Sequence, residues 1–159
     1  MLTSGDQHPE PWSPAELPAG CQGEFRLGAL EDVPRARHWI RATLDKLTAS
    51  SASATAHLVD AVELCAAELL ANAAQCSDMS PTRAVCARLA MLRDAGNGQR
   101  AVRVEVNDPG NARGERPAAR LAEPDAESGR GLAIVATLAS RWGTTTANRG
   151  NLVWFEVEY

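Results

Sequence analysis

The spacing of apolar residues along the chain predicts an ordered series of helices and strands. Apolar positions that recur every three or four residues indicate a helix, and positions that alternate with polar ones indicate a strand with one buried face. On this basis the expected helices cover 33–47, 58–74 and 131–139. The expected strands cover 23–30, 83–93, 99–107, 141–146 and 152–159, with turns at 96–98 and 148–151.

This order of elements predicts the fold class. A strand, two helices, two strands, a helix and two strands favour an α+β fold over alternating βαβ units. We expect a two-layer α/β sandwich, in which a mainly antiparallel mixed sheet carries its helices on one face. Residues 1–22 hold four prolines among polar residues and are expected to form a flexible tail before a single domain at 23–159. Residues 111–128 lack periodicity, which is typical of a lid or binding loop, or else of disorder.

Composition narrows the classes of function. A chain of 159 residues with 45% hydrophobic residues is ordinary for a globular domain. The net charge of −4 disfavours general affinity for nucleic acid, whose phosphates attract basic surfaces. No apolar run is long enough to span a membrane, and the first residues lack the features of a secretory signal, so we expect a cytoplasmic protein. The four cysteines show no zinc-ligand spacing and are expected to be free thiols.

Two polar residues stand out in the helix expected at 58–74. Glu68 and Asn72 are four residues apart and therefore share one side of that helix, beside its apolar arc. Ala61 and Cys65 fall on the same stripe, so the neighbouring surface is small and leaves room for a ligand. A carboxylate can act as a base, and an amide oxygen is a suitable hard ligand for Mg²⁺. Taken alone, the pair is equally typical of an ordinary helix surface.

Two further short motifs accompany this pair. Asp108, Pro109 and Gly110 follow the alternating AVRVEV strand, where they fit a common turn or a carboxylate that accepts a hydrogen bond from a ligand. Gly129, Arg130 and Gly131 open directly into the last helix. Glycines at that place let a ligand approach the backbone, and the start of a helix favours an anion such as phosphate.

Together the three motifs resemble the nucleotide-binding boxes of the histidine-kinase-like ATPase superfamily, also called GHKL. The matching stretches are ELLAN at 68–72, DPG at 108–110 and GRGLAIV at 129–135, in the order of that family. The resemblance runs from about residue 25 to residue 159 and is closest to compact anti-sigma-factor serine/threonine kinases. It implies the histidine-kinase-like ATPase fold, with ATP and Mg²⁺ as ligands.

The resemblance also implies a role for each matching residue. Glu68 would be the catalytic base, Asn72 would bind Mg²⁺, and Asp108 would bind the exocyclic amine of adenine. Residues 111–128 would form a lid over the nucleotide. The other residues that would contact the nucleotide are Gly110 beside the base, Gly129, Arg130, Gly131 and Leu132 around the phosphates, and Asn151.

Three positions depart from the pattern of that family. Cys76 stands where a basic residue or a histidine is frequent, and Ala112 replaces a second glycine of the adenine motif. Asn151 follows Gly150 where a threonine often completes the adenine pocket. These departures leave Glu68 and Asn72 unchanged, but they bear on the affinity for nucleotide and on the rate of catalytic turnover.

Three hypotheses of function follow. The first is an anti-sigma-factor kinase that phosphorylates a serine of an antagonist protein and sequesters a sigma factor in its other state, with a homodimer left open. The second is a protein-interaction module of weak or no activity, in which the helix that carries Arg35, Arg37 and Arg41 docks a partner. The third is an ATPase that transfers the phosphoryl group to water. Direct nucleic-acid or membrane binding is not expected in any of them.

Overall fold

The computed structural model describes residues 21–49, 56–93, 98–111, 130–147 and 150–159. The order of elements predicted from the apolar spacing is confirmed, with one short addition, the 3₁₀ helix η1 before the first α-helix. The elements are β1 (Cys21–Leu27), η1 (Leu30–Asp32), α1 (Val33–Thr48), α2 (Ala56–Cys76), β2 (Val85–Arg93), β3 (Arg100–Asp108), α3 (Arg130–Leu138), β4 (Arg141–Ala147) and β5 (Gly150–Glu158).

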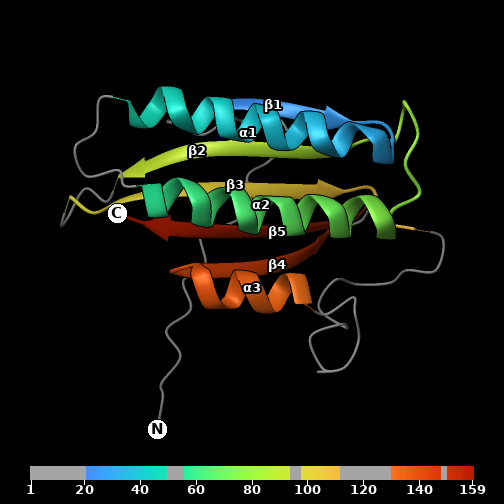
Figure 1. Cartoon of the computed structure of the whole chain (residues 1–159). Helices are drawn as coiled ribbons and strands as arrows, with labels where there is room; N and C mark the ends of the chain where they lie inside the picture. The colour runs from blue at the N-terminus through green and yellow to red at the C-terminus, as the bar shows by residue number, and fades with distance from the viewer. Residues whose placement is uncertain (1–20, 50–55, 94–97, 112–129, 148–149) are drawn as a thin grey trace, which may run out of the picture.

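The strands form one sheet in the order β1-β2-β3-β5-β4, and the three α-helices lie side by side on one face of it (Figure 1). The fold is therefore the expected two-layer α+β sandwich. All four strand pairings in the described sheet are antiparallel, so the parallel pairing that a mixed sheet would include is not among them. Strand β1 lies at the edge of the sheet and covers Cys21–Leu27, so it begins and ends earlier than the expected 23–30. Within the described ranges, no helix is long and apolar enough to cross a membrane.

Helix α1 is held by an apolar stripe and by one arginine. Pro34 lies in its first turn, where the missing backbone N–H costs nothing. Ala36, Ile40 and Leu44, spaced four residues apart, are fully buried against the sheet. Arg41 points the other way, and its guanidinium lies 2.7 Å from Glu63 on α2. The two helices are thus joined by both a core contact and an ion pair.

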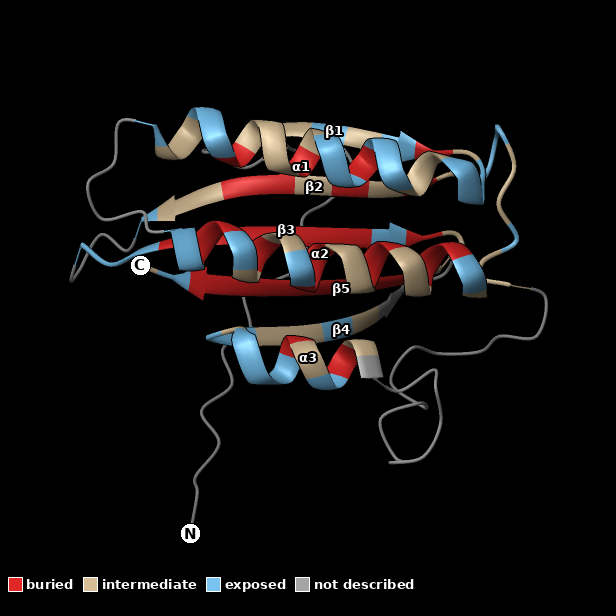
Figure 2. Cartoon of the chain, in the orientation of Figure 1, coloured by how far each residue is buried: buried red, intermediate tan, exposed pale blue. Residues whose placement is uncertain are grey.

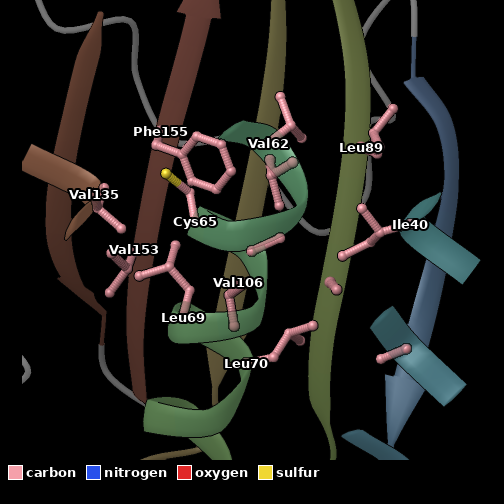
Figure 3. Close-up of a cluster of buried hydrophobic side chains, with 14 of the residues drawn as sticks. Ile40, Val62, Cys65, Leu69, Leu70, Leu89, Val106, Val135, Val153 and Phe155 are labelled. Atoms are coloured by element: carbon pink, nitrogen blue, oxygen red, sulfur yellow. The ribbon is translucent and has the colours of Figure 1, made fainter. Parts of the chain in front are cut away.

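Helix α2 is the centre of the core. Its buried side is formed by residues that recur every three or four positions, and Figure 2 shows the facing strands β3 and β5 buried over most of their length. In Figure 3, Val62, Leu69 and Leu70 point from α2 toward the sheet, where Val106 and Phe155 lie. Cys65 belongs to this cluster and is fully buried, so the expectation that it borders a ligand cleft is wrong. Burial raises the pKa of its thiol to about 11.

The centre of the sheet face opposite the helices is buried as well, although its side chains are charged. Arg103 on β3 is 1% exposed and lies 2.8 Å from Glu105 and 2.7 Å from Glu156 on β5. Its guanidinium also stacks on the ring of Trp154, 4.0 Å from the centroid. The alternation of AVRVEV is typical of a strand with one face in water, but here the polar face is paired and buried.

A hollow of about 240 Å³ lies on this second face of the sheet. The alternation of each strand places its lining residues on the side away from the three helices. They are Glu24, Arg26, Cys86, Arg88, Glu105, Asn107 and Leu152. The hollow is therefore separated by the sheet from any site formed by α2 and α3.

Candidate functional site

Glu68 and Asn72 occupy the edge of the helical layer, as their spacing predicts. Both are half-buried on α2, while Leu69 and Leu70 between them are buried in the core and fix the rotation of the helix. The amide oxygen Oδ1 of Asn72 lies 3.6 Å from Sγ of Cys76, which donates to it. This contact orients the amide along the helix and leaves Glu68 one turn away on the same side.

The first turn of α3 packs directly on Glu68. A Cβ atom at Gly131 would lie 3.0 Å from Oε2 and 3.3 Å from Cβ of Glu68, so a side chain there would crowd the carboxylate. Leu132 and Val135 are buried and anchor α3 in the core. Since the first N–H groups of a helix lack intrahelical partners and carry partial positive charge, a carboxylate and an anion-attracting helix end are brought together here.

Asp108 is the last residue of β3 and is almost completely buried, with 4% of it exposed. Its Oδ1 atom accepts hydrogen bonds from the backbone N–H of Gly110, at 2.7 Å, and from Nδ2 of Asn151, at 3.2 Å. Burial raises the pKa of this carboxyl above its usual value, while these donors and the hydroxyl of Ser77 act in the opposite direction. A buried carboxyl group with a shifted pKa is typical of a functional site.

The raised pKa of Asp108 predicts a pH-dependent stability difference for Asp108→Asn. In the folded state the protonated carboxyl is favoured, so its stabilising contribution is present below the unfolded pKa of about 3.9 and is lost as the pH rises through the folded pKa. The amide keeps the shape and carries no charge. We therefore expect the variant to gain stability relative to the parent between pH 4 and pH 7, measured by urea unfolding without ligand. A difference that stays constant over this range would contradict the assignment.

Three hydrogen bonds attach the turn after Asp108 to the last residue of α2 and to the segment that follows this helix. The N–H of Asp78 donates to the carbonyl oxygen of Gly110 at 3.1 Å, and Nδ2 of Asn111 donates to the carbonyl oxygen of Cys76 at 2.8 Å. Nη2 of Arg83 donates to the carbonyl oxygen of Pro109 at 3.0 Å. The helix that carries Asn72 and the strand that carries Asp108 are therefore fixed relative to each other.

Strand β5 completes this end of the site. The register of the sheet sets Asn151 opposite Asp108, and Gly150 lies against the backbone of the turn, where a Cβ would fall 1.8 Å from the carbonyl oxygen of Asp108. Asn151 is 7% exposed. The sequence marked it as a departure from a family pattern, and the structure shows it as a direct partner of the buried carboxylate.

The structure thus joins most of the residues singled out from the sequence into one region. Glu68 lies against Gly131, and the side chain of Asn72 accepts a hydrogen bond from Cys76. The carboxylate of Asp108 accepts hydrogen bonds from Gly110 and Asn151. Leu132 lies in the core, where it anchors the helix. Gly129, the side chain of Arg130, Ala112 and most of the expected lid at 111–128 lie outside the described residues, as does nearly all of the expected tail at 1–22.

Sequence reasoning did not predict the contacts that support these groups. Cys76 was singled out as a departure from the family pattern, but its hydrogen bond to Asn72 was not predicted, although it stands four residues after Asn72 on the same helix. Ser77, Asp78 and Asn111 carry no spacing signal, since their contacts depend on how the end of α2 meets the turn after β3. Gly150 carried a turn signal but no sign of the close backbone contact.

The arginines proposed as a docking surface on α1 have partners within the chain. Arg35 lies 3.3 Å from Asp32, and Arg41 lies within 3.4 Å of Asp45, Asp60 and Glu63. The ion pair of Arg35 joins α1 to η1, and the ion pairs of Arg41 with Asp60 and Glu63 join α1 to α2. They give two of the three arginines a role inside the domain.

The fold and the site together define an α+β domain in which a carboxylate and an amide on one helix, a glycine at the start of a second helix and a buried aspartate surround one region. A family model described as histidine kinase-like ATPase domain matches residues 28–157. The chain therefore belongs to this family, and membership implies that it binds ATP. The comparison with curated proteins found no match.

Proposed function

We propose that the protein is an ATP-dependent serine protein kinase of the anti-sigma-factor type. The observation that carries this proposal is the position of Glu68, half-buried on α2 against the first turn of α3. A carboxylate in this position can take a proton from a hydroxyl group that approaches the phosphates, a function that a protein that only bound nucleotide would not need. The resemblance to compact anti-sigma-factor kinases adds the expected partners, a sigma factor and an antagonist protein that carries the serine.

In this proposal the chain binds ATP through groups at both ends of the site. Asp108 accepts a hydrogen bond from the exocyclic amine of adenine, and the N–H groups at the start of α3 bind the phosphates. The amide oxygen of Asn72 is a hard ligand of the kind that Mg²⁺ takes alongside phosphate oxygens and water, so the residues present fit this ion. Bound there, Mg²⁺ would neutralise phosphate charge and orient the transferred group.

Glu68 would act on the protein substrate. Its carboxylate takes the proton of a serine hydroxyl while the hydroxyl oxygen forms a bond to the γ-phosphorus and the bond from that phosphorus to the bridging oxygen of ADP breaks. The products are phosphoserine, ADP and a protonated Glu68, which releases its proton to water. Because the phosphoryl group needs positioning more than covalent help, the fixed geometry of α2 and α3 matters as much as the base.

The test of nucleotide binding is Asp108→Asn, measured by calorimetric titration with ATP and Mg²⁺. The substitution places an amide NH₂ or a neutral oxygen where the carboxylate would accept a hydrogen bond from the amine of adenine. We expect affinity to fall by about 30-fold or more, the value of a hydrogen bond to a charged group. Glu158→Gln is the matched control, because it removes one carboxylate from the exposed end of β5 and should leave affinity unchanged.

Either of two results would contradict the assignment. Equal affinity in the parent and Asp108→Asn would show that the aspartate does not contact the base. Absence of ATP binding by the folded parent protein would remove the kinase proposal altogether and favour an interaction module.

A further inference from the structure

Cys76 is held in place through its backbone. It is the last residue of α2, and the carbonyl oxygen of such a residue has no partner within its own helix. Nδ2 of Asn111 donates a hydrogen bond to this oxygen at 2.8 Å. Just beyond the helix, the N–H of Asp78 donates to the carbonyl oxygen of Gly110 at 3.1 Å. The last turn of α2 is therefore fixed against the turn after β3, and the direction of the Cys76 side chain is fixed with it.

The thiol of Cys76 reaches back along the helix to the amide of Asn72. The bond from Cα to Cβ tilts toward the start of a helix, so a side chain lies over the residue four positions before it. Sγ of Cys76 lies 3.6 Å from Oδ1 of Asn72 and donates to it. Both residues are half-buried. The contact thus joins a cysteine whose backbone is fixed to an amide whose last torsion angle is soft.

The two ends of the Asn72 amide are opposite in their behaviour toward a cation. The oxygen Oδ1 has two acceptor positions, whereas the nitrogen Nδ2 carries two donors and cannot bind a metal ion. A half-turn of the last torsion angle exchanges the two atoms. A thiol that donates to Oδ1 favours one of these two orientations, and it leaves the second acceptor position of the oxygen for Mg²⁺, which takes oxygen ligands.

We infer that Cys76 is a positioning residue, which fixes the orientation of the Asn72 amide so that Oδ1, and not Nδ2, is available to Mg²⁺. This inference rests on the proposed nucleotide site and adds to it the residue that supports its metal ligand. Cys76 acts through Asn72 and does not bind the ion. Its effect therefore belongs in the gain in ATP affinity that Mg²⁺ provides, and not in the affinity for ATP alone.

The experiment measures the dissociation constant for ATP by calorimetric titration, once with Mg²⁺ and once with EDTA, in the parent protein and in three variants. We expect Cys76→Ala to reduce the gain from Mg²⁺ by about three- to fivefold, the value of a modest hydrogen bond, with an unchanged affinity in EDTA. Cys76→Ser keeps a donor and should retain most of the gain. Cys86→Ala is the matched control, because Cys86 is also half-buried but lines the hollow on the other face of the sheet.

The outcomes separate this inference from the proposal on which it rests. If the affinities with Mg²⁺ and with EDTA fall together in Cys76→Ala, Cys76 only supports the end of the helix, and the inference is overturned. A gain that is unchanged in Cys76→Ala, or that is reduced equally in Cys76→Ser, overturns it as well. If the parent binds ATP without any gain from Mg²⁺, the inference fails although the nucleotide site stands. If the parent binds ATP under neither condition, both fail.

Discussion

Gly150→Ala is expected to destabilise the domain severely. A Cβ at this position would lie 1.8 Å from the carbonyl oxygen and 2.9 Å from the carbonyl carbon of Asp108, and 3.1 Å from the carbonyl carbon of Pro109. All three atoms belong to the backbone, and Gly150 has φ +139, which side chains with a Cβ rarely adopt. The turn after β3 and the start of β5 would have to separate, which opens the ladder between Asp108 and Asn151.

We expect a loss of about 4 kcal/mol or more in the free energy of unfolding, which places this substitution among the most damaging that single residues produce. In a chain of this length the melting temperature should fall by about 8–16 °C. The measurement is thermal and urea unfolding followed by circular dichroism. The same substitution should remove ATP binding, since it moves the carboxylate of Asp108.

Gly98→Ala is the matched control for this prediction. Gly98 also has a positive φ, +72, but a Cβ there would have nothing within 4 Å. Gly98→Ala should lower the free energy of unfolding by about 1 kcal/mol, the cost of placing a residue with a Cβ at a positive φ. If both alanine substitutions cost the same, the close approach of the two backbones would not matter, and the fixed position of β5 would need another cause.

The helices and strands could be predicted because their signals are local. The buried stripe of Ala36, Ile40 and Leu44 is visible in the sequence as a four-residue repeat, and it leads directly to α1. The start of α1 at Pro34 follows from the same stretch of chain. Fold class then follows from the order of such elements, because few arrangements bury all of their apolar faces.

The second face of the sheet could not be predicted in this way. Arg103 and Glu156 are paired in the structure but stand 53 residues apart. The sequence of β3 alternates in the same way whether its polar side chains lie in water or form ion pairs with a neighbouring strand. Which strand lies beside β3 is decided by the order of strands in the sheet. Burial of such a pair is tolerated because each charge has a partner.

The places of the candidate site residues on their helices and strands were predictable, and the contacts that support these residues were not. The i, i+4 spacing of Glu68 and Asn72 places both on one side of a helix whatever the rest of the chain does. The contact of Asn151 with Asp108, in contrast, depends on the register of β3 and β5, which no local pattern specifies. Residues that position other residues are found only when the pairing of the strands is known.

Glu68→Gln is expected to separate chemistry from binding. The amide keeps the shape of the side chain and its contact with Gly131 but cannot take a proton from a serine hydroxyl. We expect phosphoryl transfer to slow by about 10²–10⁴-fold, the usual contribution of a general base. The affinity for ATP with Mg²⁺ should change by about threefold at most, since in the proposed site the hydrogen bond to adenine is made by Asp108.

Transfer is measured as ADP formed from ATP and Mg²⁺, with candidate antagonist proteins that contain serine and with water alone. Glu63→Gln is the matched control, because it makes the same substitution on the same helix, where Glu63 contacts Arg41 on the far side from α3. Arg41 keeps its contacts with Asp45 and Asp60, so this control should cost about 1 kcal/mol of stability or less. ADP formation that needs no protein acceptor would favour the simple ATPase. Full transfer by Glu68→Gln would rule out Glu68 as the base, because the substitution removes the group that accepts the proton and keeps the shape of the side chain.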